Sequence, residues 1–278
     1  MTHLNLGILE GPLLLFGGPY SNLQATRALK GHAERLGIPP SHIICTGDAV
    51  AYFAKPNETV ELLREWGVNV LMGNCEESLG WVSDDCGCGF EKGSTCDLLT
   101  SSWYPYANSV LTDTNRQWMR SLKRVITFTY NDRQFTVVHG SYKKMNQFVF
   151  ASTYNSLKEE SLISANSDGI IAGHCGIPFT QIINDKLWHN PGVIGMPAND
   201  GTPRTWFSLW FIKDKNIVIE HRALDYNYEK TADELLLAGS ANAYVDSVKS
   251  GLWPSMDVLP AKEKAQQGKS LQETIIRY

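Results

Sequence analysis

Residues 43–48 read Ile-Ile-Cys-Thr-Gly-Asp, a short apolar run that ends in a glycine and an acidic side chain. The same order returns in residues 68–74, Val-Asn-Val-Leu-Met-Gly-Asn, and in residues 169–174, Gly-Ile-Ile-Ala-Gly-His. In residues 135–140, Phe-Thr-Val-Val-His-Gly, the histidine precedes the glycine. Short apolar runs bounded by turn residues are typical of buried strands. Each run therefore predicts a strand with a polar group at its carboxyl end.

Helical patterns separate these runs, and a strand–helix alternation is typical of a parallel sheet wound with helices. The apolar periods predict helices over residues 22–36, 58–66, 115–122, 153–165, 230–238 and 243–249. Strands are predicted over residues 13–16, 43–45, 68–71, 125–130, 134–138, 169–172, 180–183, 187–188, 206–212 and 217–220. Asn131-Asp132 predicts a hairpin turn between two of them. The fold class is α/β.

The composition is that of a globular protein, with 43% hydrophobic and 19% charged residues over 278 positions. We expect a single domain over residues 1–260. Residues 78–110 show neither the helical nor the strand period, so they are interpreted as a long insertion that contains cysteines. Residues 261–278 are polar and are expected to form a solvated helix or a frayed tail.

Charge and hydropathy exclude several partners. The formal charge is −4, and the basic residues are scattered along the chain, which disfavours a nucleic-acid duplex. The apolar run at residues 13–16 is too short for a signal peptide or a membrane span, so no membrane partner is expected. Six cysteines without such a signal indicate reduced thiols and a cytoplasmic location. The oligomeric state stays open, with a homo-oligomer among the alternatives.

Four polar side chains follow predicted strands and form a candidate metal site. They are Asp48, Asn74, His139 and His174. A single Gly-Asp or Gly-His pair is usually only a turn or a structural residue. Ligands of open α/β sheets bind at the carboxyl ends of strands, however, so four such residues are expected to converge. Their mixed nitrogen and oxygen donors suit a transition metal (Mn, Fe, Zn, Co or Ni) rather than Ca²⁺ or Mg²⁺.

The order of these motifs resembles the calcineurin-like metallophosphoesterases, in particular the small bacterial phosphodiesterase and phosphatase branch. The matching segments are Thr46-Gly47-Asp48, Gly73-Asn74-Cys75-Glu76, Val138-His139-Gly140, Gly173-His174-Cys175-Gly176 and the closing loop from Asn190-Pro191-Gly192 to Arg204. The resemblance covers nearly the whole chain. It implies a four-layer α/β/β/α sandwich of the metallo-dependent phosphatase type.

The first motif of that family, Asp-x-His-Gly-Asn, appears here as Gly18-Pro19-Tyr20-Ser21-Asn22. The last histidine of the family's Gly-His-x-His motif is Gly176. By this resemblance, one of the two family metal positions loses three protein ligands, whereas Asp48, Asn74, His139 and His174 complete the other. The pattern predicts a reduced site with one transition-metal ion.

Further residues are candidates for roles around the metal. Tyr20, Cys75 and Glu76, together with Asn74, are expected to shape or assist a phosphoryl pocket. Tyr20 has packing as its alternative, and Cys75 has the alternatives of an extra metal ligand or a redox-sensitive thiol. Another group, Cys86, Cys88 and Cys96, is either a second metal or redox site or part of a lid shaped by glycines.

The resulting function is metal-dependent hydrolysis of a phosphate monoester or diester of a small molecule. Two other classes compete with this hypothesis. One is a binding or regulatory protein that keeps the scaffold with little turnover, which the missing ligands favour. The other is a thiol-linked or redox reaction at a mononuclear metal, which the nearby cysteines favour.

Overall fold

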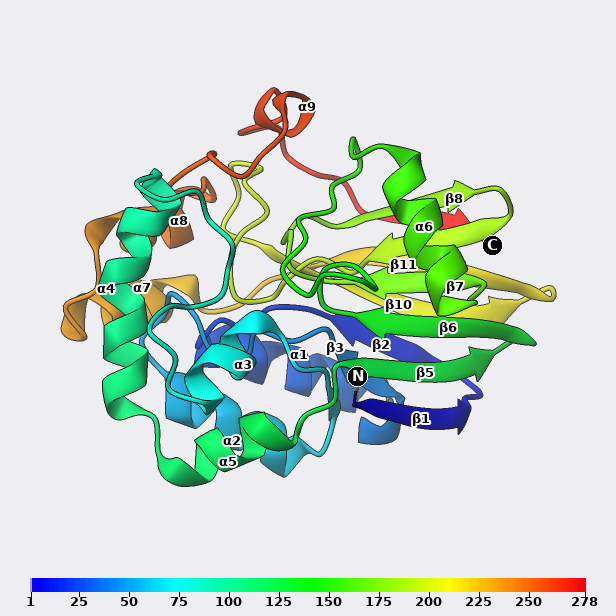
Figure 1. The fold of residues 1–278 in the computed structure, drawn as a ribbon, viewed down its shortest axis with the longest axis horizontal. Coiled ribbons are helices and arrows are strands. Elements are labelled where there is room, and N and C mark those ends of the chain that lie inside the picture. Colours follow the sequence, from blue (N-terminus) through cyan, green and yellow to red (C-terminus); the bar gives the residue numbers. More distant parts are fainter. Residues whose placement is uncertain (1) are drawn as a thin grey trace.

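The protein is described by a computed structural model that covers residues 2–278. Within this range the strands form two six-stranded sheets (Figure 1). The strand order is β1-β5-β6-β7-β9-β8 in the first sheet and β12-β11-β10-β2-β3-β4 in the second. Apolar side chains from both sheets form one buried cluster, so the sheets pack face to face.

The second sheet contains the strands that the sequence marks most clearly. Its members are β2 (Leu13–Phe16), β3 (Ile43–Cys45), β4 (Asn69–Val70), β10 (Thr205–Lys213), β11 (Asn216–Leu224) and β12 (Thr274–Arg277). β2, β3 and β4 run parallel, and β10, β11 and β12 add antiparallel pairs. Every residue of β2 and β3 is buried, because helices cover one face and the other sheet covers the opposite face.

The first sheet contains β1 (His3–Ile8), β5 (Val125–Tyr130), β6 (Arg133–Val138), β7 (Gly169–Ala172), β8 (Phe179–Ile183) and β9 (Lys186–Asn190). β6 and β7 pair in parallel, as do β7 and β9. β5 and β6 form the predicted hairpin, whose turn residues Asn131 and Asp132 have φ of 51° and 60°. Positive φ at both central positions is the backbone of a type I′ turn.

Helices cover the outer faces of both sheets. The outer face of the second sheet packs on α1 (Leu23–Arg35), α2 (Pro56–Trp66), α3 (Asn74–Gly80), α4 (Thr95–Val110), α5 (Asp113–Ser121), α7 (Tyr228–Leu237) and α8 (Asn242–Ser250). The first sheet packs on α6 (Asn155–Ala165). Short turns of helix occur at η1 (Pro40–His42) and α9 (Ala261–Lys264). The predicted four-layer α/β/β/α sandwich is therefore confirmed (Figure 1).

Regular structure differs from the sequence-based expectations in two segments. Residues 78–110, predicted to lack a period, include the end of α3 and all of α4. Of the sixteen residues of α4, Trp103, Tyr104 and Ala107 are buried, and Pro105 lies inside the helix, so the apolar period is weak. The C-terminal tail begins with the exposed helix α9, as one of the two expected alternatives has it, but residues 274–277 form β12 along the edge of β11 instead of fraying. Such a short edge strand is stabilised by main-chain pairing, which leaves little trace in the side-chain pattern.

Among the described residues, no helix combines the length and the apolar composition that a membrane crossing requires.

Candidate metal centre

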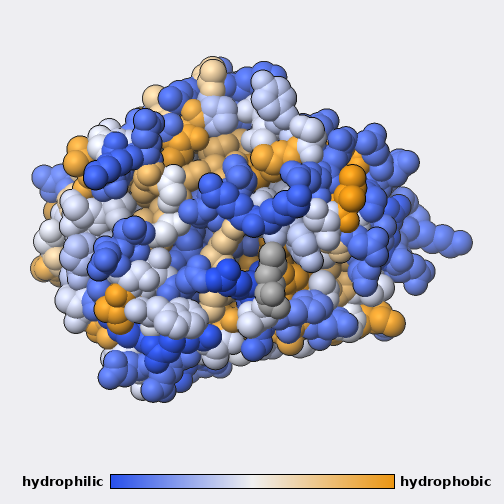
Figure 2. Space-filling view, in the orientation of Figure 1, coloured by the Kyte–Doolittle hydropathy of each residue, from blue (hydrophilic) through white to orange (hydrophobic). Residues whose placement is uncertain are grey.

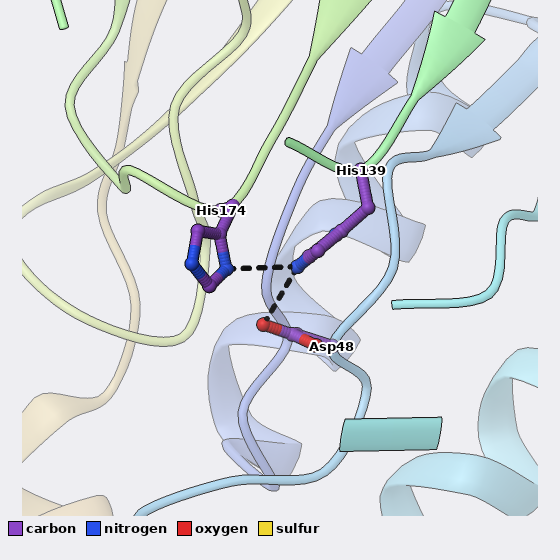
Figure 3. Close-up of side chains that lie close together, drawn as sticks. All are labelled: Asp48, His139 and His174. Carbon is purple, nitrogen blue, oxygen red and sulfur yellow. Dashed lines mark hydrogen bonds and ion pairs between the residues drawn. The ribbon is translucent and has the colours of Figure 1, made fainter. Parts of the chain in front are cut away.

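The four candidate ligands lie at one end of the sandwich, two from each sheet. Asp48 follows β3, and Asn74 follows β4 as the first residue of α3. His139 follows β6 and His174 follows β7 (Figure 3). All four side chains are buried, with exposed fractions of 2–8%. Parallel strands of both sheets thus end at the same place, as the sequence pattern predicts.

Their donor atoms gather around one nitrogen. His139 Nε2 lies 3.1 Å from Asp48 Oδ2, 3.1 Å from Asn74 Oδ1 and 3.1 Å from His174 Nδ1. Figure 3 shows the two imidazoles and the carboxylate directed toward one another. Donors bound to one ion at about 2.0–2.2 Å stand roughly 3.0–3.5 Å apart, so this spacing fits a shared transition metal.

Hydrogen bonds on the far side fix which atoms face the centre. His139 Nδ1 lies 2.7 Å from the Thr46 carbonyl oxygen, which can only accept, so Nδ1 carries the proton and Nε2 keeps a lone pair. Asn74 Nδ2 donates to the Cys86 carbonyl at 2.9 Å, which turns Oδ1 toward His139. Lone-pair atoms therefore face one another in a buried space. Such an arrangement needs a cation between them, and the donor set fits a divalent transition metal.

The electrostatics agree with this requirement. Burial, reinforced by the neighbouring His139, lowers the pKa of His174 to about 3, so its imidazole is neutral at pH 7. Burial alone would lower the pKa of His139, but the charge and hydrogen bond of Asp48 raise it above its ordinary value. Without another cation, a proton is thus drawn to His139 beside Asp48. Metal and proton compete for the same lone pairs.

Glu76, which the sequence analysis assigns to a phosphoryl pocket, contacts the backbone on both sides of the metal centre in the structure. Its carboxylate accepts backbone N–H groups of Asp48 at 2.8 Å, Ala49 at 2.6 Å and Gly73 at 2.8 Å. The Gly73 bond is half of a capping box, since Glu76 is the third residue of α3. Burial, with a contribution from Asp48, raises the pKa of Glu76 to about 7. Glu76 therefore positions the loop that carries Asp48.

Two glycines allow this loop to approach the start of α3. Gly47 has φ of +99°, and a Cβ there would lie 2.7 Å from the Gly73 nitrogen. A Cβ on Gly73 would overlap Asp48 Oδ1 and lie 2.9 Å from Glu76 Oε2. Asp48 itself has φ of 58° and His174 has φ of 61°, so both ligands occupy left-handed turns directly after a glycine.

We expect Gly73→Ala to displace the Asp48 carboxylate, because the added methyl has no free space. Metal affinity should fall at least about tenfold, and thermal stability should fall with it. Elemental analysis after dialysis and thermal unfolding measure both effects. Gly31→Ala in α1 is the control, since a Cβ there meets Arg35 Nη1 at 3.6 Å and α1 should become slightly more stable. Parent-like metal content in Gly73→Ala would contradict the assignment.

Tyr20 and Cys75 lie beside the ligands as neutral groups. Tyr20 is buried with φ of 52°, and its ring meets Tyr52 edge to face at 4.9 Å. Burial, reinforced by Asp48, raises the pKa of Tyr20 well above its usual range, so the phenol keeps its proton. Burial and Asp48 likewise raise the pKa of the Cys75 thiol. Cys75 N donates to Asp48 Oδ1 at 3.2 Å, so the backbone of this residue supports the carboxylate.

The structure does not bring Cys86, Cys88 and Cys96 together. Cys86 and Cys88 form a disulfide across Gly87, so the expectation of reduced thiols fails for this pair, whereas the other four cysteines are free. Gly87 has φ of +64°, and this turn places the two sulfurs within bonding reach. Cys96 opens α4 and lines a pocket beside His174. Within residues 2–278, the group of three or more acidic, His or Cys side chains that is spaced to hold a metal ion consists of Asp48, His139 and His174.

Sequence reasoning missed three contributors to the site. The Thr46 carbonyl orients His139, and the Cys86 carbonyl orients Asn74. Main-chain groups leave no residue-specific signal, so neither could be found from sequence. The third is the support given by Glu76, and the spacing Gly73-x-x-Glu76 at the start of a helix was a readable sign of it.

Two packed sheets lie between helices, and buried imidazole, carboxylate and amide groups meet at the strand ends, which is the arrangement of a metal-binding α/β protein. A profile of the calcineurin-like phosphoesterase superfamily domain matches residues 21–211, more than half of the chain, and the protein belongs to this superfamily. The superfamily implies a divalent transition metal as cofactor. The predicted family and the predicted metallophosphoesterase activity are confirmed at this level.

Individual relatives are distant. The protein MJ0912 of Methanocaldococcus jannaschii is 25% identical over 235 residues, which cover 78% of this chain and 88% of that protein. A metallophosphoesterase structure from Sphaerobacter thermophilus has a TM-score of 0.67 at 19% identity and covers 88% of this chain and 100% of its own. The structure of PH1004 from Pyrococcus horikoshii has a TM-score of 0.73 at 15% identity, covering 87% and 99%. These two structures share the fold.

Proposed function

We propose that the protein hydrolyses a phosphate monoester or diester of a small molecule at one metal ion held by Asp48, Asn74, His139 and His174. The observation that carries the proposal is the convergence of three donor atoms on His139 Nε2, each at 3.1 Å. Lone-pair atoms that face one another in a buried space are stabilised by a shared cation. We infer a small-molecule substrate from the basic residues, which are scattered along the sequence and not grouped into a basic segment for a polyanion.

A single ion is supported by what fills the other family position. A Cβ on Gly18, where φ is +37°, would overlap the ring of Tyr20. A Cβ on Gly176, where φ is +74°, would lie 3.3 Å from the ring of Trp253. Aromatic side chains thus crowd the positions at which the family resemblance places ligands, and neither backbone favours a larger residue.

The side chains divide the work of the proposed reaction. A bound divalent ion supplies a Lewis acid that polarises a phosphoryl oxygen and activates water. Asp48 contributes the negative charge of the ligand set, and Thr46 keeps the imidazole of His139 in the tautomer that offers Nε2. The Tyr20 phenol, which keeps its proton and lines the pocket beside His174, is a neutral donor for a phosphoryl oxygen. Asn74, with Oδ1 turned inward, completes the set.

We expect protein purified without chelator to contain one equivalent of a transition metal per chain. Asp48→Asn removes the carboxylate charge from the ligand set and should lower metal affinity by about a factor of ten or more. The exposed Asp233→Asn is the control and should retain the metal. Elemental analysis measures the number of metal ions per chain. Two equivalents would refute the one-ion site, and no metal at all would favour a binding protein on the same scaffold.

A further inference from the structure

A pocket next to His174 extends beyond the two lining residues, Tyr20 and His174, that take part in the chemistry described above. Its cavity volume is about 80 Å³. Its walls come from segments far apart in the chain, among them Phe90, Leu99 in α4, Phe148 and Trp253. His174 lines the pocket and is also one of the candidate metal ligands, so the pocket lies directly beside the metal centre. Figure 2 shows apolar side chains on this face in the region between α4 and α6, below α9.

Aromatic rings lead from the metal centre into this pocket. The ring of Phe148 lies 4.2 Å from that of His174, and Phe90 stacks on Phe148 at 6.2 Å. On another wall, Tyr20 contacts Tyr52 edge to face. Rings placed in this way present both faces and edges, which suit a further flat aromatic group.

The absence of charged side chains from the pocket lining argues against a charged occupant. No Lys, Arg, Asp or Glu side chain is among the described residues that line the pocket. A second phosphate or a carboxylate would require cationic or N–H donors there, whereas the hydroxyl groups of the lining, such as those of Tyr244 and Ser255, are neutral. An uncharged apolar group gains free energy by leaving water at these walls.

The pocket also accounts for the altered family positions. Tyr20 and Gly176 both line it, and these are two of the three positions at which the resemblance places lost ligands. Because Gly176 has no side chain, the ring of Trp253 can lie over it. The space in which the family pattern places metal ligands is bounded by apolar rings in this protein.

We propose that this pocket binds an uncharged aromatic group of the phosphoester substrate while the phosphoryl group lies at the metal centre. The inference rests on the proposed function, since the metal centre supplies the other anchor. It narrows the substrate class from small phosphoesters in general to aromatic ones.

Binding of non-hydrolysable phosphonates tests the assignment without turnover. Phenylphosphonate, hexylphosphonate and methylphosphonate share the phosphoryl anchor and differ in the attached group. Titration calorimetry on the metal-loaded protein should give a Kd for phenylphosphonate about tenfold or more below that for methylphosphonate, with hexylphosphonate between them. Trp253→Ala should reduce this preference several-fold. Leu252→Ala is the matched control, because Leu252 is the preceding residue and does not line the pocket.

Each outcome bears on the inference. Phe90→Ala gives a second test on another loop, should Trp253→Ala fold poorly. Equal affinities for the three phosphonates would overturn the inference and leave metal-dependent phosphoester hydrolysis standing. Tightest binding of hexylphosphonate would replace the aromatic group by an aliphatic chain and also overturn it. If none of the three binds to the metal-loaded protein, the metal centre itself is not a phosphoryl site and both proposals fail.

Discussion

Replacing His139 by Ala should abolish metal binding and lower the turnover of a phosphoester by about 10³-fold or more. Its Nε2 is the atom on which the other three donors converge, so its loss opens the centre of the ligand set. Metal catalysis contributes several kcal/mol of transition-state stabilisation, and about 4 kcal/mol corresponds to 10³ in rate. Elemental analysis and kcat/KM measure the two effects together.

The control for this variant is His42→Ala. His42 lies in η1 before β3, at the opposite end of that strand from Asp48, and it contacts the Pro12 carbonyl. Its removal should leave both metal content and kcat/KM near the parent values. A folded His139→Ala protein that keeps its metal would refute the ligand assignment, and one that loses the metal but keeps its activity would refute the proposed metal chemistry.

A second large effect is expected from Glu76→Gln, this time on stability. The carboxylate accepts three backbone N–H groups in a space with no exposure. A Gln side chain offers one oxygen and an NH₂ group, which would face N–H donors and leave at least one of them unsatisfied. The free energy of unfolding should fall by about 3 kcal/mol or more, as urea titration would show.

Glu77→Gln is the matched control, because it makes the same change at the next position of α3. Glu77 is partly exposed and pairs with Arg124 at the surface, where such pairs contribute about 0–1 kcal/mol. Equal destabilisation by the two variants would contradict the positioning role of Glu76. A stable Glu76→Gln protein with impaired turnover would instead support a role for Glu76 in the phosphoryl pocket.

The sequence predicts this fold best where burial is complete. β2 and β3 have the predicted bounds, because strands covered on both faces must be apolar throughout. α4 escaped prediction because few of its residues are buried, and β12 because pairing along an edge depends on main-chain groups. Periodicity detects apolar faces, so elements with small apolar faces remain invisible to it.

The candidate site likewise contains residues that could be predicted from the sequence and residues that could not. The positions of Asp48 and His174 followed from strand ends, since strand direction decides where those side chains meet. The place of Glu76 under the Asp48 loop and of Trp253 over Gly176 depends on tertiary packing between distant segments. No local pattern around residue 253 could indicate its partner some 77 positions earlier.

The ligand set is divided evenly between the two sheets, with Asp48 and Asn74 on one and His139 and His174 on the other. The separation of its oxygen half from its imidazole half is therefore fixed by the thickness of the apolar layer between the sheets. Ile44 lies in that layer together with Val137, one from each sheet and both fully buried. A change in the volume of such a side chain alters the sheet spacing and, through it, the distances among the donor atoms. Residues that never touch a substrate thus take part in setting the chemistry of this enzyme.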